Sequence, residues 1–236
     1  LLVAGVVVVV WYMRKKREFL RQRFFQQINR VRMENLRSRI SPHFTFNVLG
    51  REINQFNGSE EVKHNLMELV KYLRRSLELT EKLSVSLQDE LDFVRTYIEL
   101  ERGRVGEDFV ATVTVEDGLD ATRIMIPSMI VQIPVENAIK HGLAGKDGKK
   151  ELSVYVSRET NGIRITVTDN GRGYLPQVVS TTRGTGTGLK VLYQTIQLLN
   201  TKNKSDKIRF DITNRSDGQT GTEVSVYIPF RFSYDL

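Results

Sequence analysis

The chain has 236 residues, enough for one large domain or two small ones, and its 40% hydrophobic and 27% charged residues are ordinary for a globular protein. It contains no cysteine, which excludes disulfides, cysteine nucleophiles and thiolate metal sites. Its three histidines are widely separated along the sequence, so a histidine-rich metal site is not expected.

The net charge of +7 has its largest concentration near the N-terminus, where Arg14–Arg17 opens a basic segment that continues to Arg39. This segment directly follows an apolar run, Leu1–Met13, that ends with Trp11 and Tyr12. Such an order is typical of a membrane helix entering the cytoplasm, an interpretation we favour over a nucleic-acid-binding arm. The run is shorter than the roughly 20 residues that cross a bilayer. We therefore expect residues 1–13 to be the C-terminal part of a transmembrane helix, with a sensor preceding them.

The first half of the sequence predicts helices. Residues 14–39 contain neither glycine nor proline, and their single apolar stripe favours pairing with a second copy of the chain, with a solvated linker helix as the alternative. Ser41 and Pro42 are favoured at the start of a helix, which we expect to end near the turn signal at residues 57–59. Two further helices are predicted over residues 60–79 and 87–101.

The sequence changes character after Gly106. Alternating β-branched residues predict strands, and Asn161–Gly162 is a hairpin signal between two of them. The expected strands cover residues 109–115, 152–156, 163–168, 208–213 and 222–229; the expected helices cover 127–141, with a kink at Pro134, and 188–199. This pattern predicts an α+β fold in which dimerising helices precede a sandwich of a mixed sheet and a few helices.

Three short segments carry the candidate chemistry. The first, Glu136–Gly142, places Asn137 and His141 on one face of a helix and pairs Glu136 with Lys140 on another. An asparagine oxygen can bind Mg²⁺, and Lys140 and His141 can meet phosphate charge. A surface helix that simply ends at Gly142 is the structural alternative.

The second and third segments are rich in glycine. Asp169–Gly173 follows a buried strand, so Asp169 can accept a hydrogen bond from an amino group such as that of adenine, although a tight turn would use the same residues. Gly184–Gly188 leads into a helix, whose first backbone N–H groups can bind phosphate, with a flexible loop as the alternative. It matches neither the Walker pattern nor the dinucleotide fingerprint.

In this order, on a mixed sandwich, the three segments resemble the GHKL ATP-binding fold of gyrase-type ATPases and histidine kinases, with the helices on one face of the sheet. The resemblance implies that Asn137 binds Mg²⁺ and that Asp169 holds the adenine amino group. Gly171 and Gly173 would flank the adenine, with Thr222 nearby. A lid over residues 172–186 and phosphate contacts from Gly186, Gly188 and Leu189 are also implied.

A fourth segment narrows the family. Residues 40–49, ISPHFTFNVL, resemble the phosphoacceptor box of LytS/YehU-type sensor histidine kinases, as do residues 87–91 and 97–102. The helix expected after Gly184–Gly188 resembles the corresponding helix of a Bacteroidetes-like subgroup of these kinases. The resemblance, which covers about residues 36–230, makes His43 the phosphoacceptor, and neutral imidazole is a competent nucleophile. Asn47, one helical turn later, could orient a water for phosphatase activity.

The resemblance implies a homodimeric sensor histidine kinase of a two-component system, held in the bacterial inner membrane with its catalytic part in the cytoplasm. ATP and Mg²⁺ are the expected cofactors, and a response regulator, with the LytTR type as a candidate, is the expected partner; direct nucleic-acid binding is not expected. The expected domains are the membrane remnant (1–13), a juxtamembrane coiled-coil helix (14–40), a helical dimerisation and phosphoacceptor region (41–104) and the GHKL ATP-binding domain (105–236).

Two positions depart from wider patterns. Phe44 follows His43 where many sensor kinases carry an acidic residue, so the general base is unassigned. Ile133 stands four residues before Asn137, where hydrolysing GHKL relatives carry a glutamate, and this favours phosphotransfer over hydrolysis. A GHKL-type ATPase and a non-catalytic dimeric nucleotide-binding scaffold are the alternatives.

Overall fold

The computed structural model describes residues 11–16, 19, 60–174, 187–201, 203 and 205–234. The helices predicted around His43 and the loop 175–186 lie outside these ranges. Residues 11–16 are helical, and Trp11 and Tyr12 are exposed. None of the helices formed by the described residues is both long and apolar enough to cross a membrane.

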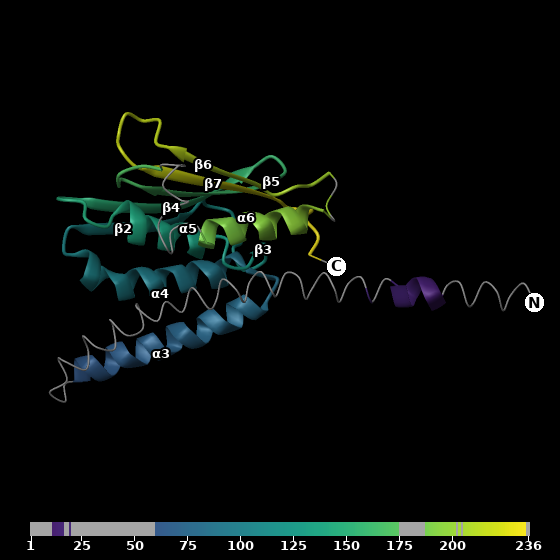
Figure 1. Cartoon of the computed structure of the whole chain (residues 1–236), viewed down its shortest axis with the longest axis horizontal. Coiled ribbons are helices and arrows are strands. Elements are labelled where there is room, and N and C mark those ends of the chain that lie inside the picture. The colour runs from purple at the N-terminus through teal and green to yellow at the C-terminus, as the bar shows by residue number, and fades with distance from the viewer. Residues whose placement is uncertain are drawn as a thin grey trace, which may run out of the picture.

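A five-stranded sheet forms one layer of the structure (Figure 1). Its strands follow the order β2-β4-β5-β7-β6, with β2 and β4 parallel and the other neighbours antiparallel. The bounds are Phe109–Val115 for β2, Lys150–Glu159 for β4, Gly162–Asp169 for β5, Arg209–Asn214 for β6 and Thr222–Pro229 for β7. The predicted mixed sheet is therefore confirmed, with β4 longer than expected.

Alternation along the strands separates a core face from an outer face. Val156, Ile165 and Val226 are register partners across β4, β5 and β7, and all three are buried. The residues between such positions are mostly threonine, serine or charged, and they are partly or fully exposed. One face of the sheet therefore packs against helices while the other meets water, as in many antiparallel sheets.

Helices α4, α5 and α6 lie against the core face, and α3 packs on α4 further from the sheet (Figure 1). Their bounds are Glu60–Glu81 for α3, Leu87–Val105 for α4, Gln132–Asn137 for α5 and Thr187–Asn200 for α6. Stacked rings of Tyr72 and Phe93, with centroids 4.8 Å apart, join α3 to α4. The hydroxyl oxygen of Ser86 accepts the Asp89 N–H at 3.0 Å, which caps the start of α4.

The single helix expected over residues 127–141 is wrong. Met125–Pro127 forms a short strand, β3, that pairs with β1 (Ser84–Ser86), and α5 begins only at Gln132. The pairing joins residues about forty positions apart, so local periodicity could not reveal it. Pro134 is the third residue of α5 and lies in its first turn, and not in the helix interior where the sequence placed it.

Candidate nucleotide-binding site

Asn137 ends α5 and is followed by a π-helical turn, η1 (Ala138–Gly142). Its side-chain amide donates to the carbonyl oxygen of Ile133 at 2.7 Å. Only the NH₂ group can make this bond, so the orientation of the amide is fixed and its oxygen remains as the atom that could bind a cation. The residue therefore fits the Mg²⁺ role that the resemblance gives it.

Lys140 and His141 follow on η1. The Lys140 ammonium pairs with the Glu136 carboxylate at 2.6 Å, which confirms that these residues share a face. Burial lowers the pKa of the partly buried His141, and the neighbouring Lys140 charge acts in the same direction, so the imidazole is neutral at pH 7. A neutral ring can donate one hydrogen bond to a phosphate oxygen without adding charge.

The end of η1 lies against the loop after β5, and the contact involves two glycines, Gly142 and Gly171. A Cβ on Gly142 would lie 2.7 Å from Asp169 Oδ1, and a Cβ on Gly171 would lie 2.1 Å from the Gly142 carbonyl oxygen. Gly142 is therefore required by its approach to the Asp169 carboxylate and Gly171 by its approach to the Gly142 backbone. The helical turn does end at Gly142, but that end alone does not explain the glycine. This contact fixes the first segment against the second.

Asp169 ends β5 on the core side and is 4% exposed. Its carboxylate accepts the Gly171 N–H at 2.8 Å. Burial raises the pKa of Asp169, although the Gly171 N–H, the nearby polar groups of Thr222 and the charge of Arg215 act in the opposite direction. Two carboxylate oxygens offer about four lone-pair directions, so Asp169 can accept a further amino group.

Thr222 is brought to Asp169 by Gly221. Gly221 has a φ of +140°, and a Cβ there would lie 1.9 Å from the Asp169 carbonyl oxygen. Gly173 also has a positive φ, +84°, and the loop beside it is held by Asn214, whose side-chain oxygen accepts the Tyr174 N–H at 2.6 Å. The structure thus brings together the residues expected around an adenine: Asp169, Gly171, Gly173 and Thr222.

The third segment is described only from residue 187. Gly188 and Leu189 lie in the first turn of α6, and Leu189 packs partly buried against the core. Gly186, together with His43 and Asn47, lies outside the described residues. The phosphate-binding role of this segment stays a prediction.

Sequence reasoning missed two residues. Glu90, on α4, is fully buried and binds the backbone at the start of α5. Arg215, on the β6–β7 turn, lies close enough to lower the pKa of Asp169. A signal for Glu90 was present, because this acid stands at helical spacing between the apolar residues Leu87 and Val94.

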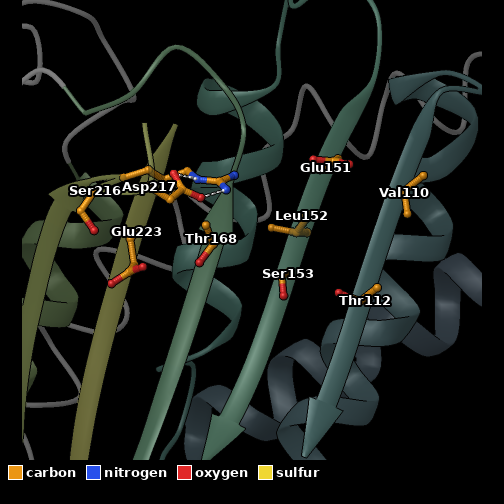
Figure 2. Close-up of a pocket in the computed structure, with 10 residues that line it drawn as sticks. Val110, Thr112, Glu151, Leu152, Ser153, Thr168, Ser216, Asp217 and Glu223 are labelled. Carbon is orange, nitrogen blue, oxygen red and sulfur yellow. Dashed lines mark hydrogen bonds and ion pairs between the residues drawn. The ribbon is translucent and has the colours of Figure 1, made fainter. Parts of the chain in front are cut away.

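A cavity of about 430 Å³ opens on the opposite, outer face of the sheet (Figure 2). Thr112, Ser153, Thr168 and Glu223 line it in register across neighbouring strands. Because successive side chains alternate, Asp169 points away from it, toward the core. This cavity therefore belongs to a different surface from the candidate nucleotide site.

Two family models match the chain. The model described as histidine kinase matches residues 31–109. The model described as histidine kinase-, DNA gyrase B- and HSP90-like ATPase matches residues 122–231, which include Asn137, Asp169 and Thr222.

Curated relatives and solved structures with similarity to the chain carry related descriptions. The sensor histidine kinase YpdA of Escherichia coli is 28% identical over 86% of this chain and 35% of its own length. The sensor histidine kinase/phosphatase LytS of Staphylococcus aureus is 30% identical over 84% of this chain and 34% of its own length. The histidine kinase domain of an Erythrobacter litoralis blue-light activated kinase gives a TM-score of 0.47 at 16% identity, covering 78% of this chain and 94% of that one.

The chain spans about a third of the length of these curated relatives. Within that span, the two family matches lie in tandem and together cover most of the sequence. The chain belongs to the histidine kinases, with a histidine kinase domain followed by a histidine kinase-, DNA gyrase B- and HSP90-like ATPase domain.

Proposed function

We propose that this chain is the kinase part of a membrane-anchored sensor histidine kinase, which phosphorylates His43 with ATP and passes the phosphoryl group to an aspartate of a response regulator. The observation that carries the proposal is the contact between Gly142 and Gly171. It places the end of the helical segment that contains Asn137, an asparagine suited to a metal ion, against Asp169, a buried carboxylate suited to an adenine amino group. One site can thereby bind both the adenine and the metal-bound phosphates of one nucleotide.

Each residue of the site has a distinct task. Asp169 accepts the adenine amino group, Thr222 orients that carboxylate, and Gly171 and Gly173 border the ring. Asn137 holds Mg²⁺, which when bound neutralises phosphate charge. The remaining phosphate contacts come from Lys140, His141, Gly186, Gly188 and Leu189.

Phosphoryl transfer requires an in-line nucleophile. A ring nitrogen of His43 forms a bond to the γ-phosphorus while the bond to the bridging oxygen breaks and ADP departs, so catalysis is mostly positioning and charge neutralisation. Asn47, one turn later, orients a water that hydrolyses the phosphorylated partner. The similarity to LytS, a sensor histidine kinase/phosphatase, supports this second activity.

The proposed domains follow one another along the chain in the order in which a signal would pass from the membrane to the ATP-binding domain. Residues 1–13 hold the protein in the bacterial inner membrane, and residues 14–40 transmit a movement through a coiled coil. Residues 41–104 form the homodimer and carry His43, and residues 105–236 bind ATP in the cytoplasm. A LytTR-type response regulator receives the phosphoryl group.

The proposal is tested by following γ-labelled ATP and Mg²⁺ with the purified chain and with Asn137→Ala. We expect label on the wild-type protein and at least a tenfold reduction in the variant, since the variant lacks the cation ligand. Release of free phosphate without labelled protein would support the ATPase alternative. An absence of both products in the wild type would support the non-catalytic scaffold.

A further inference from the structure

The start of α5 has no capping side chain of its own. Its N-cap residue is Val131, which carries no hydrogen-bonding atom in its side chain. The N–H groups of Met129, Val131 and Gln132 instead donate to the Glu90 carboxylate at 2.8, 2.7 and 3.3 Å. The cap of α5 is therefore supplied by another helix, α4, through a side chain that is fully buried.

The other backbone donors of this first turn are also accounted for. Ile133 N–H donates to Met129 O at 3.2 Å and Val135 N–H donates to Val131 O at 3.2 Å, while Pro134 has no N–H. Met129 has a φ of +69°, a left-handed conformation that residues other than glycine adopt at a cost in free energy. The Glu90 carboxylate binds on both sides of Met129 and holds the chain in that conformation.

One line of hydrogen bonds runs from Glu90 to the asparagine of the site. Glu90 Oε2 accepts from Met129 N, Met129 O accepts from Ile133 N, and Ile133 O accepts from the side chain of Asn137 at 2.7 Å. The carbonyl that orients the Asn137 amide thus belongs to the turn that Glu90 caps. A displacement of this turn would displace the amide oxygen.

We infer that Glu90 is a positioning residue for Asn137: its carboxylate sets the start of α5 and thereby the place of the metal-binding amide oxygen, an inference that rests on the proposed role of Asn137. Partners that orient a metal ligand from outside its coordination sphere typically contribute about 10- to 100-fold in metal affinity. A glutamine cannot replace Glu90, because its NH₂ group would face one of three backbone donors. Position 90 therefore requires both the negative charge and the length of the glutamate side chain.

The test measures ATP binding to the purified chain by calorimetry, once in EDTA and once across a Mg²⁺ titration. The variants are Glu90→Gln, Asn137→Ala and the double variant, with Glu99→Gln, an exposed acid on the same helix, as the matched control. Glu90→Gln should raise by about tenfold the Mg²⁺ concentration that gives half of the Mg²⁺-dependent increase in ATP affinity. The ATP affinity in EDTA, which depends on Asp169, should change by less than about twofold. Glu99→Gln should match the wild type.

The double variant distinguishes positioning from general damage. If Glu90 acts through Asn137, Glu90→Gln adds no further loss of Mg²⁺ dependence to Asn137→Ala. Equal loss of affinity with and without Mg²⁺, or additive losses in the double variant, would overturn the inference. Glu90→Asp, which keeps the charge but withdraws it by one methylene, provides the same comparison if Glu90→Gln does not fold.

Failure of the proposed function gives a different result. If Asn137→Ala leaves Mg²⁺ dependence unchanged, the asparagine does not hold the metal, and both the site assignment and this inference fall. If Asn137→Ala loses Mg²⁺ dependence while Glu90→Gln retains it, the inference alone falls.

Discussion

The buried carboxylate of Asp169 favours ATP binding but lowers the stability of the fold. Burial raises its pKa, so holding the carboxylate ionised at neutral pH opposes folding. We predict that Asp169→Asn binds ATP at least tenfold more weakly, because the amide presents one oxygen where the carboxylate presents two. Calorimetric titration of both proteins measures the difference.

The same substitution should change how stability depends on pH. A carboxyl group whose pKa is higher in the folded state stabilises the fold below its unfolded value of 3.8, and this contribution is lost as the pH rises through the folded value. The stability of Asp169→Asn relative to the wild type should therefore increase as the pH rises through this window. Urea denaturation at several pH values tests this, and a relative stability that falls with pH would contradict it.

Gly171 leaves no room for a side chain. A Cβ there would lie 2.1 Å from the Gly142 carbonyl oxygen, so Gly171→Ala must separate η1 from the loop after β5. We expect a loss of about 1–3 kcal/mol in the free energy of unfolding, as for other overpacked positions, together with weaker ATP binding. Urea denaturation and calorimetry measure the two effects.

Gly118→Ala is the control for this prediction. Gly118 has a φ of +83° with open space around it, far along the sequence from the site. Alanine there should cost about 1–2 kcal/mol through backbone strain and leave ATP affinity unchanged. If Gly171→Ala behaved in the same way, the close contact would have no role in binding.

At the scale of elements, α4 depends on its cap. Ser86 is the N-cap of the helix that carries Glu90 in its first turn. Ser86→Ala should lower the free energy of unfolding by about 1 kcal/mol. Chemical denaturation checks this, with Thr96→Ala on the exposed face of the same helix expected to change it by less than about 0.5 kcal/mol. Equal losses in both variants would show that the cap is unimportant.

The regular elements could be predicted because their patterns are local. The alternation in β2 and the spacing of apolar residues in α3 and α6 each lie within a single segment, and the structure confirms them. β1 and β3 could not be predicted, since each has three residues and exists only through pairing with the other. The start of α5 was missed for the same reason, because its cap comes from Glu90.

The site was predicted in part. The glycine-rich segments identified Asp169 and its neighbours, and the structure brings these residues against Gly142, which ends the segment that contains Asn137. The sequence could not show why Gly142 and Gly171 are glycines, because the reason is their contact with each other and with Asp169. Arg215 was also missed, since its effect on Asp169 depends on the fold of the β6–β7 turn.

At the scale of the whole molecule, α4 belongs to the same core as the sheet. Helix α4 lies along the core face of the sheet (Figure 1), and Leu91, Val94 and Ile98 on it are buried in the cluster that contains Val154 and Ile165. The proposed domain boundary after residue 104 marks the change from helical to strand-rich sequence. It does not mark a break in packing, because α4 and the sheet share one core. Helix α4, which lies in the proposed phosphoacceptor region, also caps α5, the helix that carries Asn137.

This packing predicts the result of truncation. A chain beginning at Gly106 would expose the apolar surface that α4 covers, and it should bind a hydrophobic dye and unfold without cooperativity. A chain beginning at Ser84 keeps α4 and should unfold cooperatively. Cooperative unfolding of the shorter chain would show that α4 is not part of the core unit.

Phosphorylation of His43 is tested by locating the label on the protein. The purified chain and His43→Gln are incubated with γ-labelled ATP and Mg²⁺, and labelled protein is then exposed to acid and to alkali. We predict label on the wild type that is lost in acid, retained in alkali and absent from His43→Gln. Label that persists in His43→Gln, or that withstands acid, would show that His43 does not carry the phosphoryl group.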